Sequence, residues 1–221
     1  MDARALTIAA DGCERVSALL QTSDDARAAL VLAHGAGAGM THPFMAAIAG
    51  ALADRGIATL RYQFPYMERR SRRPDPPKVA QAAVRAAVDE AGRVLAGIPL
   101  FAGGKSFGGR MTSQAQAAAP LPGVRGLVFL GFPLHPAGRP SAERAEHLFA
   151  VKIPMLFLQG TRDALAELSL LEPLMARIGE SATLERFEGA DHSFHVRGAG
   201  NDAQAMSLLA VTIARWVAVR P

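Results

Sequence analysis

The sequence has little cysteine, and it lacks both a long apolar run and a recognisable leader. Cys13 is the one cysteine among 221 residues, which excludes an internal disulfide and favours a reducing compartment. No apolar run approaches the roughly 18 residues that span a bilayer. Residues 1–4 are not a basic region followed by a long apolar stretch, as a secretory signal would require. We therefore expect a cytoplasmic protein that makes no membrane contact.

A large excess of charge of one sign is also missing. The net charge is +4, with 20% charged and 50% hydrophobic residues, which is typical of a globular chain and not of a disordered one. The basic excess gathers in one proline-interrupted stretch that contains Arg69, Arg70, Arg72, Arg73 and Lys78. No aromatic residues interleave them and no basic helix face is visible. We expect no nucleic-acid partner and favour a solvated loop that could face a substrate.

Apolar runs and helical stretches alternate along the chain, which predicts βαβ units and a mostly parallel sheet. The expected strands are 5–8, 16–20, 28–33, 57–62, 100–104, 126–131, 155–158 and 183–187, and the expected helices are 41–55, 77–96, 110–119, 164–178 and 202–219. Asp11-Gly12 predicts a turn that joins the first two strands into an antiparallel ribbon at a sheet edge. Thr41 is a plausible cap for its helix. We expect one α/β domain over residues 1–221.

A serine between glycines follows the buried strand 100–104. Gly104-Lys105-Ser106-Phe107-Gly108 fits the G-x-S-x-G pattern, although a chain with 21 glycines could contain such a string by chance. In that pattern the serine sits at a strained strand-to-helix turn, where neighbouring side chains would clash with backbone. The strand before it and the helix after it favour Ser106 as a nucleophile. Lys105 could face an anionic substrate or point into solvent, and we favour solvent.

The loop at 34–39, His-Gly-Ala-Gly-Ala-Gly, has almost no side chains and follows the strand 28–33. Its backbone N–H groups can approach a developing oxyanion closely. We expect the Phe107 amide to be paired there with an amide of Ala36 or Gly37. A dinucleotide-binding loop is the competing interpretation, but the G-x-G-x-x-G spacing fails and no acidic residue ends the next strand. We expect no cofactor and no metal.

Two more strand exits carry the remaining polar groups. Asp163 follows the strand 155–158 and could orient a histidine ring, cap the following helix, or do both. His192 follows the last strand and is the expected general base for Ser106, with His195 as its rival. Asp191 is a rival to Asp163, but it adjoins His192, so we expect its side chain to diverge from the ring.

The order Ser106, Asp163, His192 and these motifs resemble the α/β-hydrolase superfamily over nearly the whole chain. More narrowly, the chain is similar to the compact branch near the dienelactone hydrolases and the KANSL- and testis-expressed-type hydrolase-like proteins. Dienelactone hydrolases have cysteine where this chain has Ser106, so their substrate is not carried over. The resemblance implies the α/β-hydrolase fold, a Ser106–His192–Asp163 triad and oxyanion donors at Phe107 and Ala36.

The segment 132–153 lies where such enzymes place a lid, and it is short. We therefore expect a minimal lid and an open or shallow pocket for small acyl groups. Candidate pocket residues are Gly37, Met40, His42, Lys105 and Phe132, together with Phe64, Tyr66 and His135, although packing in the core is the more ordinary fate of the aromatic ones.

Two function hypotheses follow from the sequence. One is a serine hydrolase that cleaves a small ester or thioester through an acyl-enzyme, as a monomer or homodimer. The other is a non-catalytic binding or scaffold protein that keeps the fold.

Overall fold

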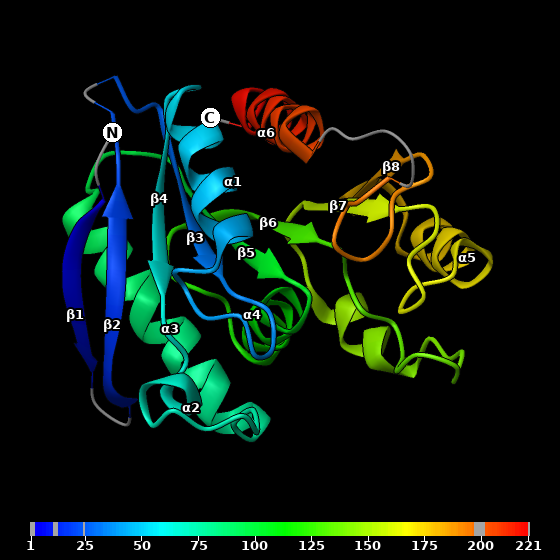
Figure 1. The fold of residues 1–221 in the computed structure, drawn as a ribbon, viewed down its shortest axis with the longest axis horizontal. Coiled ribbons are helices and arrows are strands. Elements are labelled where there is room, and N and C mark those ends of the chain that lie inside the picture. Colours follow the sequence, from blue (N-terminus) through cyan, green and yellow to red (C-terminus); the bar gives the residue numbers. More distant parts are fainter. Residues whose placement is uncertain (1–2, 11–12, 24, 197–201, 221) are drawn as a thin grey trace.

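A computed structural model describes residues 3–10, 13–23, 25–196 and 202–220 (Figure 1). It contains an eight-stranded sheet of order β1-β2-β4-β3-β5-β6-β7-β8. The strands are β1 (Arg4–Ala10), β2 (Cys13–Gln21), β3 (Ala28–Ala33), β4 (Ile57–Tyr62), β5 (Leu100–Lys105), β6 (Val124–Leu130), β7 (Met155–Gly160) and β8 (Ala182–Phe187). β2 is antiparallel to β1 and β4, whereas the pairs from β4 to β8 are parallel.

Helices cover both faces of the sheet (Figure 1). They are α1 (Pro43–Ala53), α2 (Pro65–Glu68), α3 (Pro77–Val94), α4 (Phe107–Ala118), α5 (Leu168–Ile178) and α6 (Asp202–Ala218), with short 3-10 turns η1 (Glu143–Ala150) and η2 (Gly179–Ser181). α1 and α6 pack on one face with Leu30, Leu32 and Phe101. α3 and α4 pack on the other face, around Val31, Ala102 and Phe129. This arrangement confirms the predicted mostly parallel sheet flanked by helices.

The central strands are buried on both sides because both layers cover them. Every residue of β3 is buried, as expected for a continuous apolar run in a parallel sheet. β3, β5 and β6 are neighbours, so the loops after β3 and β5 meet at one edge of the sheet. The loops that follow β7 and β8 open at the same edge, because these strands are parallel to the rest.

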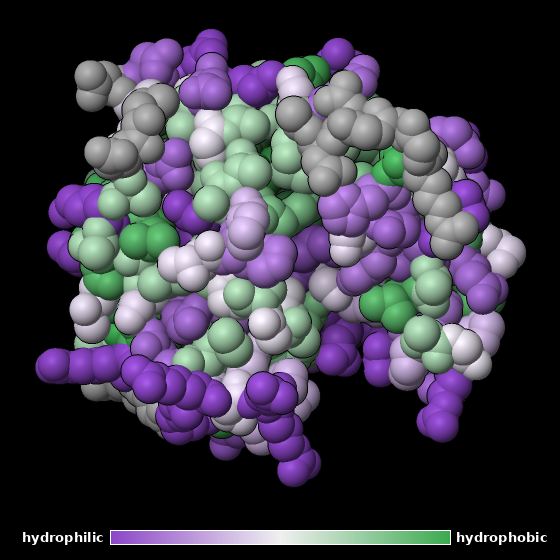
Figure 2. Space-filling model, viewed as in Figure 1, coloured by the Kyte–Doolittle hydropathy of each residue, from purple (hydrophilic) through white to green (hydrophobic). Residues whose placement is uncertain are grey.

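The two margins of the sheet differ. β1 and β2 form the antiparallel ribbon expected at one edge, while the predicted Asp11-Gly12 turn lies outside the described residues. β8 forms the other edge; its first three residues are partly buried, whereas Glu185 and Arg186 are exposed. Figure 2 shows one face of the molecule, where strongly hydrophilic side chains project over the α2 region.

Three helix starts differ from the prediction, and one of them is α4, which begins at Phe107, directly after Ser106, and not at residue 110. Thr41 is not the cap of α1, because His42 is the N-cap and its Nδ1 accepts a hydrogen bond from the Phe44 amide at 3.2 Å. Helix α5 begins at Leu168 and not at residue 164, and its N-cap is Glu167. Asp163 therefore caps no helix. Its Oδ1 accepts from the Leu165 amide at 2.8 Å and closes a short turn instead.

Candidate active site

Ser106 lies at a sharp turn between β5 and α4. Its φ of 51° and ψ of −115° place a residue that has a Cβ in a sparsely populated region of backbone space. The Ser106 amide donates to the Leu130 carbonyl at 3.1 Å, and its carbonyl accepts from the Arg110 amide at 3.1 Å. The turn is thus tied to β6 on one side and to the first turn of α4 on the other.

The glycines around Ser106 are required by close backbone contacts. A Cβ on Gly104 would lie 2.3 Å from the Ala33 carbonyl oxygen, and one on Gly108 would lie 2.6 Å from the carbonyl oxygens of both Ala33 and His34. Real side chains do not tolerate such distances. The steric argument for this motif therefore holds in the structure, and β3 is the neighbour that imposes it.

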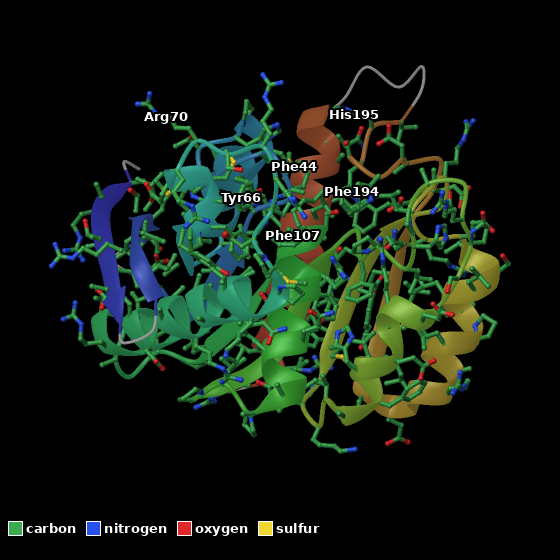
Figure 3. All side chains as sticks on the ribbon, turned by 90° about the horizontal axis from the view of Figure 1, so that it is seen from below. Phe44, Tyr66, Arg70, Phe107, Phe194 and His195 are labelled. Carbon is green, nitrogen blue, oxygen red and sulfur yellow. The ribbon has the colours of Figure 1, made fainter. Side chains whose placement is uncertain are left out.

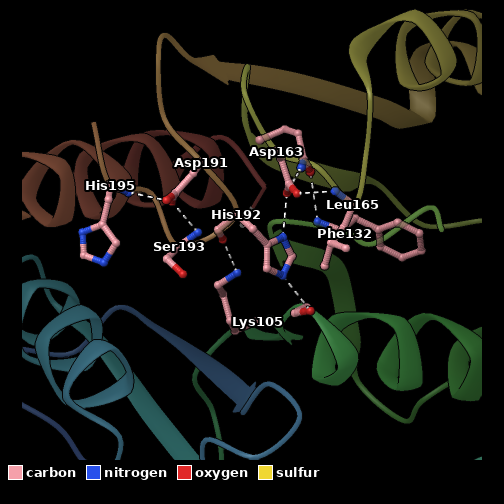
Figure 4. Close-up of polar contacts among 10 residues, drawn as sticks. Lys105, Phe132, Asp163, Leu165, Asp191, His192, Ser193 and His195 are labelled. Atoms are coloured by element: carbon pink, nitrogen blue, oxygen red, sulfur yellow. Dashed lines mark hydrogen bonds and ion pairs between the residues drawn. The ribbon is translucent and has the colours of Figure 1, made fainter. Parts of the chain in front are cut away.

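Three side chains from three strand exits form one chain of hydrogen bonds (Figure 4). The His192 Nε2 lies 2.9 Å from Ser106 Oγ, and its Nδ1 lies 2.7 Å from Asp163 Oδ2. The Asp163 side chain is fully buried, whereas the His192 side chain is 25% exposed. The carboxylate fixes the tautomer with the proton on Nδ1, which leaves Nε2 free to accept the serine proton.

Gln159 lies behind Asp163, and the sequence analysis did not identify it. Its Nε2 donates to Asp163 Oδ2 at 2.5 Å, and its Oε1 accepts from the Phe132 amide at 2.9 Å. Gln159 is fully buried. The oxygen that accepts from His192 therefore receives a second hydrogen bond, so the rotation of the carboxylate is fixed from both sides. A polar residue within the otherwise apolar strand β7 was the available signal.

In the loop after β3, one of the two candidate amides is already hydrogen-bonded and the other is not. The Gly37 amide donates to the Tyr66 hydroxyl at 2.9 Å. Within the described part of the chain, the amides of Ala36 and Phe107 donate no hydrogen bond. Of the two donors considered from the sequence, Ala36 is therefore the available one.

His34 orients that peptide. Its Nε2 accepts from the Phe64 amide at 3.1 Å, so the proton is on Nδ1, which donates to the Gly35 carbonyl at 2.7 Å. Because the peptide is planar and trans, fixing the Gly35 carbonyl fixes the Ala36 N–H in the opposite direction. His34 is fully buried, and this burial lowers its pKa to about 4, so the ring is neutral at pH 7.

The rival residues lie elsewhere. Asp191 Oδ1 accepts from the amides of Ser193 at 2.8 Å and His195 at 3.0 Å, so its carboxylate closes the loop after β8 and does not contact the His192 ring. His192, and not His195, contacts Ser106. Figure 4 shows both arrangements side by side.

A cavity of about 760 Å³ opens beside Ser106 and His192. It is lined by Gly35, Ala36, Ala38, His42, Pro43, Phe44, Met45, Ala47, Lys105, Ser106, Leu165, His192, Ser193, Phe194, His195 and Met206. Its volume falls within the range of about 300–1,000 Å³ that is typical of small-molecule sites. Figure 3 shows Phe44 and Phe194 close together. The centroids of these two rings lie 6.1 Å apart and the rings are stacked.

The predicted pocket residues divide into two groups. His42 and Lys105 line the cavity, whereas Gly37, Met40 and Phe132 are absent from its lining. Phe132 is fully buried in the core, and the Met40 amide donates to Gln63 Oε1 at 2.9 Å, beside the end of β4. Phe64, Tyr66 and His135 are also buried, as ordinary packing predicts. No residue of the segment 132–153, all of which the structure describes, lines the cavity.

Lys105 does not point into solvent, contrary to our expectation. Its Nζ donates to the His192 carbonyl at 2.5 Å and lies 5.9 Å from the centre of the Phe44 ring and 5.6 Å from that of Phe194. Burial lowers its pKa to about 8, which outweighs the attraction of Asp163 and Asp191. The position of Lys105 at the end of a strand does not predict where its side chain points. The direction depends on the loop after β8, which supplies the His192 carbonyl.

A second serine–histidine contact lies on the far side of α4. Ser113 Oγ lies 2.7 Å from His147 Nε2, and Ser113 is fully buried. Burial lowers the pKa of His147 to about 4. Neither residue lines the cavity beside Ser106, so this pair is a natural comparison for Ser106 and His192.

The described residues contain neither a metal-binding cluster nor a membrane-spanning helix. No group of three or more His, Cys, Asp or Glu side chains there could hold a metal ion. No helix among them is both long and apolar enough to cross a membrane.

Comparison with known proteins adds the family. The chain is similar to the dienelactone hydrolase of Anabaena variabilis (20% identity over 99% of this chain and 98% of that chain, TM-score 0.80). It is also similar to XC6422 of Xanthomonas campestris, described as an α/β serine hydrolase without lid (20% identity, 98% and 95% covered, TM-score 0.75). An α/β serine hydrolase homologue of Coxiella burnetii matches with 17% identity, 96% and 98% coverage and a TM-score of 0.77. A family model described as an alpha/beta hydrolase domain matches residues 26–218, and the chain therefore belongs to the α/β-hydrolase family.

Proposed function

We propose that this protein is a serine hydrolase that cleaves small carboxylic esters or thioesters through an acyl-enzyme. The observation that carries the proposal is the continuous chain of hydrogen bonds from Asp163 through His192 to Ser106. It ends at a cavity of sufficient size for a substrate. The names of the similar structures, which include serine hydrolases and an esterase domain, support the same reaction class.

Acylation follows from the orientation of each group. His192 Nε2 takes the proton of Ser106 Oγ as that oxygen attacks the substrate carbonyl. The amides of Phe107 and Ala36 donate to the oxyanion, and the N-terminus of α4 adds a favourable dipole. The tetrahedral species then collapses, and the proton on Nε2 goes to the departing alkoxide or thiolate.

Deacylation uses the same base. His192 takes a proton from a water molecule, whose oxygen attacks the acyl carbon and releases the carboxylic acid. The proton returns to Ser106 Oγ, so the enzyme is regenerated. Asp163 holds the ring orientation and stabilises the positive charge that the imidazole carries in both steps.

Hydrolysis of p-nitrophenyl butyrate tests the proposal. We expect turnover by the wild-type chain and a loss of at least about 1,000-fold in kcat/KM for Ser106→Ala. Ser113→Ala is the matched control, because Ser113 also contacts a histidine but lies away from the cavity. Equal activity of Ser106→Ala and wild type would contradict the proposal. No turnover of any ester by wild type would favour the non-catalytic binding protein instead.

A further inference from the structure

The charge of the cavity lining is one-sided. The lining residues include four groups that are basic or can become so, His42, Lys105, His192 and His195, and no aspartate or glutamate. The remaining surface is mostly apolar, with the Phe44 and Phe194 rings and the Met45 and Met206 side chains. A ligand that matches this cavity is apolar over most of its surface and carries negative charge.

Lys105 is the fixed positive charge in this lining. Its ammonium has three N–H donors, and one of them donates to the His192 carbonyl. In the described part of the chain, no carboxylate lies within ion-pair distance of its Nζ. Withdrawing an ammonium from water without a counter-anion is costly, and the two aromatic rings offset only part of that cost.

The two carboxylates that act on Lys105 come from two strand exits. Asp163, after β7, and Asp191, after β8, attract its charge from a distance and raise its pKa. Both carboxylates are already occupied, one by His192 and the other by backbone amides. Neither therefore takes the place of a direct anionic partner.

We propose that the physiological substrate is an anionic ester or thioester whose carboxylate pairs with the Lys105 ammonium between Phe44 and Phe194. This inference rests on the proposed function, because it concerns the substrate of the same cavity. Lys105 immediately precedes Ser106, so the carboxylate lies only a few bonds from the carbonyl that is cleaved. Lys105 is then a specificity-determining residue that selects substrates carrying a carboxylate. Its position at the end of a strand did not by itself distinguish this role from a solvent-exposed side chain.

Two matched ester pairs test this substrate class. On the acyl side the probes are p-nitrophenyl hydrogen adipate and p-nitrophenyl methyl adipate. On the leaving-group side they are 4-acetoxybenzoate and its methyl ester. For each pair, kcat/KM of the anionic ester is divided by that of the neutral ester. We expect the ratio to exceed about 10 for one pair in wild type, since a charge-assisted hydrogen bond is worth about 10- to 100-fold.

Lys105→Met should bring that ratio to about 1, because methionine keeps an apolar stem and removes the charge. Lys78→Met is the matched control, since Lys78 is exposed at the start of α3 and its variant should keep the wild-type ratio. A structural role of Lys105 alone would lower the hydrolysis of both esters together and leave the ratio unchanged. That result would overturn the proposal.

Two further measurements keep the test decisive if Lys105→Met folds poorly or if turnover is absent. In wild type, the anionic preference should fall from about pH 7 to about pH 9 as Lys105 deprotonates, because the ester carboxylates stay ionised there. In Ser106→Ala, calorimetric titration with the same pairs should show tighter binding of the anionic ester. Equal binding of both esters would contradict the inference even if the protein hydrolyses neutral esters. Tighter binding of the anionic ester with no turnover by wild type would support the inference and refute the proposed function.

Discussion

The two halves of the candidate active site are held in different ways. The Ser106 turn is fixed by its own backbone, packed against the Ala33 and His34 carbonyls with no space for a Cβ. The His192 loop, at the edge of the sheet, is closed by its own Asp191 but is positioned against Ser106 by side chains from distant elements, namely Asp163 and Lys105. Changes in the turn should therefore damage the fold, whereas changes behind the loop should reduce activity in a folded protein.

The largest effect is expected for Gly108→Ala. The new Cβ would meet two backbone carbonyl oxygens at 2.6 Å, so we expect a loss of more than about 3 kcal/mol of unfolding free energy or failure to fold. Chemical denaturation measures it. Gly92→Ala is the matched control, because a Cβ at Gly92 in α3 would meet no heavy atom within 4 Å outside the adjoining backbone of its own helix. Alanine should stabilise that helix by up to about 1 kcal/mol. Equal stability of both variants would refute the steric account.

The second largest effect is expected for Asp163, which positions the His192 ring. Asp163→Asn should keep the fold but lower kcat by about 1,000- to 10,000-fold, because an amide favours the wrong tautomer of His192. Asp191→Asn is the matched control, and its side-chain oxygen can still accept the two loop amides, so we expect less than about a tenfold loss. Ester hydrolysis by variants of equal helical content separates the two, and a larger loss for Asp191→Asn would reverse the assignment.

A smaller effect is expected for Gln159, which contacts Asp163 and not the reacting atoms. Gln159→Leu removes a donor to Asp163 Oδ2 and an acceptor of the Phe132 amide. We expect kcat to fall about 10- to 100-fold with KM little changed, together with a loss of about 1–3 kcal/mol of stability.

Gln116→Leu is the matched control for that variant. Gln116 is also buried, and its Oε1 accepts from the Leu121 amide at 2.8 Å, away from the cavity. Both variants should lose stability, but only Gln159→Leu should lose kcat. A similar kcat in the two variants would show that Gln159 has a purely structural role.

The smallest effect concerns pH. Burial lowers the pKa of His34 to about 4 in the folded chain, so the unfolded chain binds more protons between that value and the ordinary 6.5. The stabilisation is complete above about pH 6.5 and is lost as pH falls, by on the order of 2 kcal/mol at about pH 4.5. His34→Gln should show a shallower loss of unfolding free energy over this range. An unchanged slope would contradict the buried neutral ring.

The difference between the Ser106 turn and the His192 loop also explains which features the sequence could predict. The Ser106 turn depends on local spacing, so its glycines, its strand and its helix were all visible in the sequence. The positions of Asp163 and His192 followed from the rule that parallel strands open at one edge.

The features that the sequence did not predict depend on contacts between residues that are far apart in the chain. Lys105 was expected in solvent because nothing in its neighbours along the chain predicts the His192 carbonyl as a partner. The role of Gln159 requires the distance between β7 and the Phe132 amide, and the choice between Ala36 and Gly37 requires the Tyr66 hydroxyl. The early start assigned to α5 was wrong because residues 164–167 have helical composition but follow the turn that Asp163 closes.

The most direct test of the central claim is whether His192 activates Ser106. A fluorophosphonate probe reacts with an activated serine, and peptide mapping by mass spectrometry locates the adduct. We predict a single adduct on Ser106, at least about 100-fold slower labelling in His192→Ala, and an undiminished rate in His147→Ala, whose histidine contacts Ser113. An adduct on Ser113, or equally fast labelling of Ser106 without His192, would contradict the account.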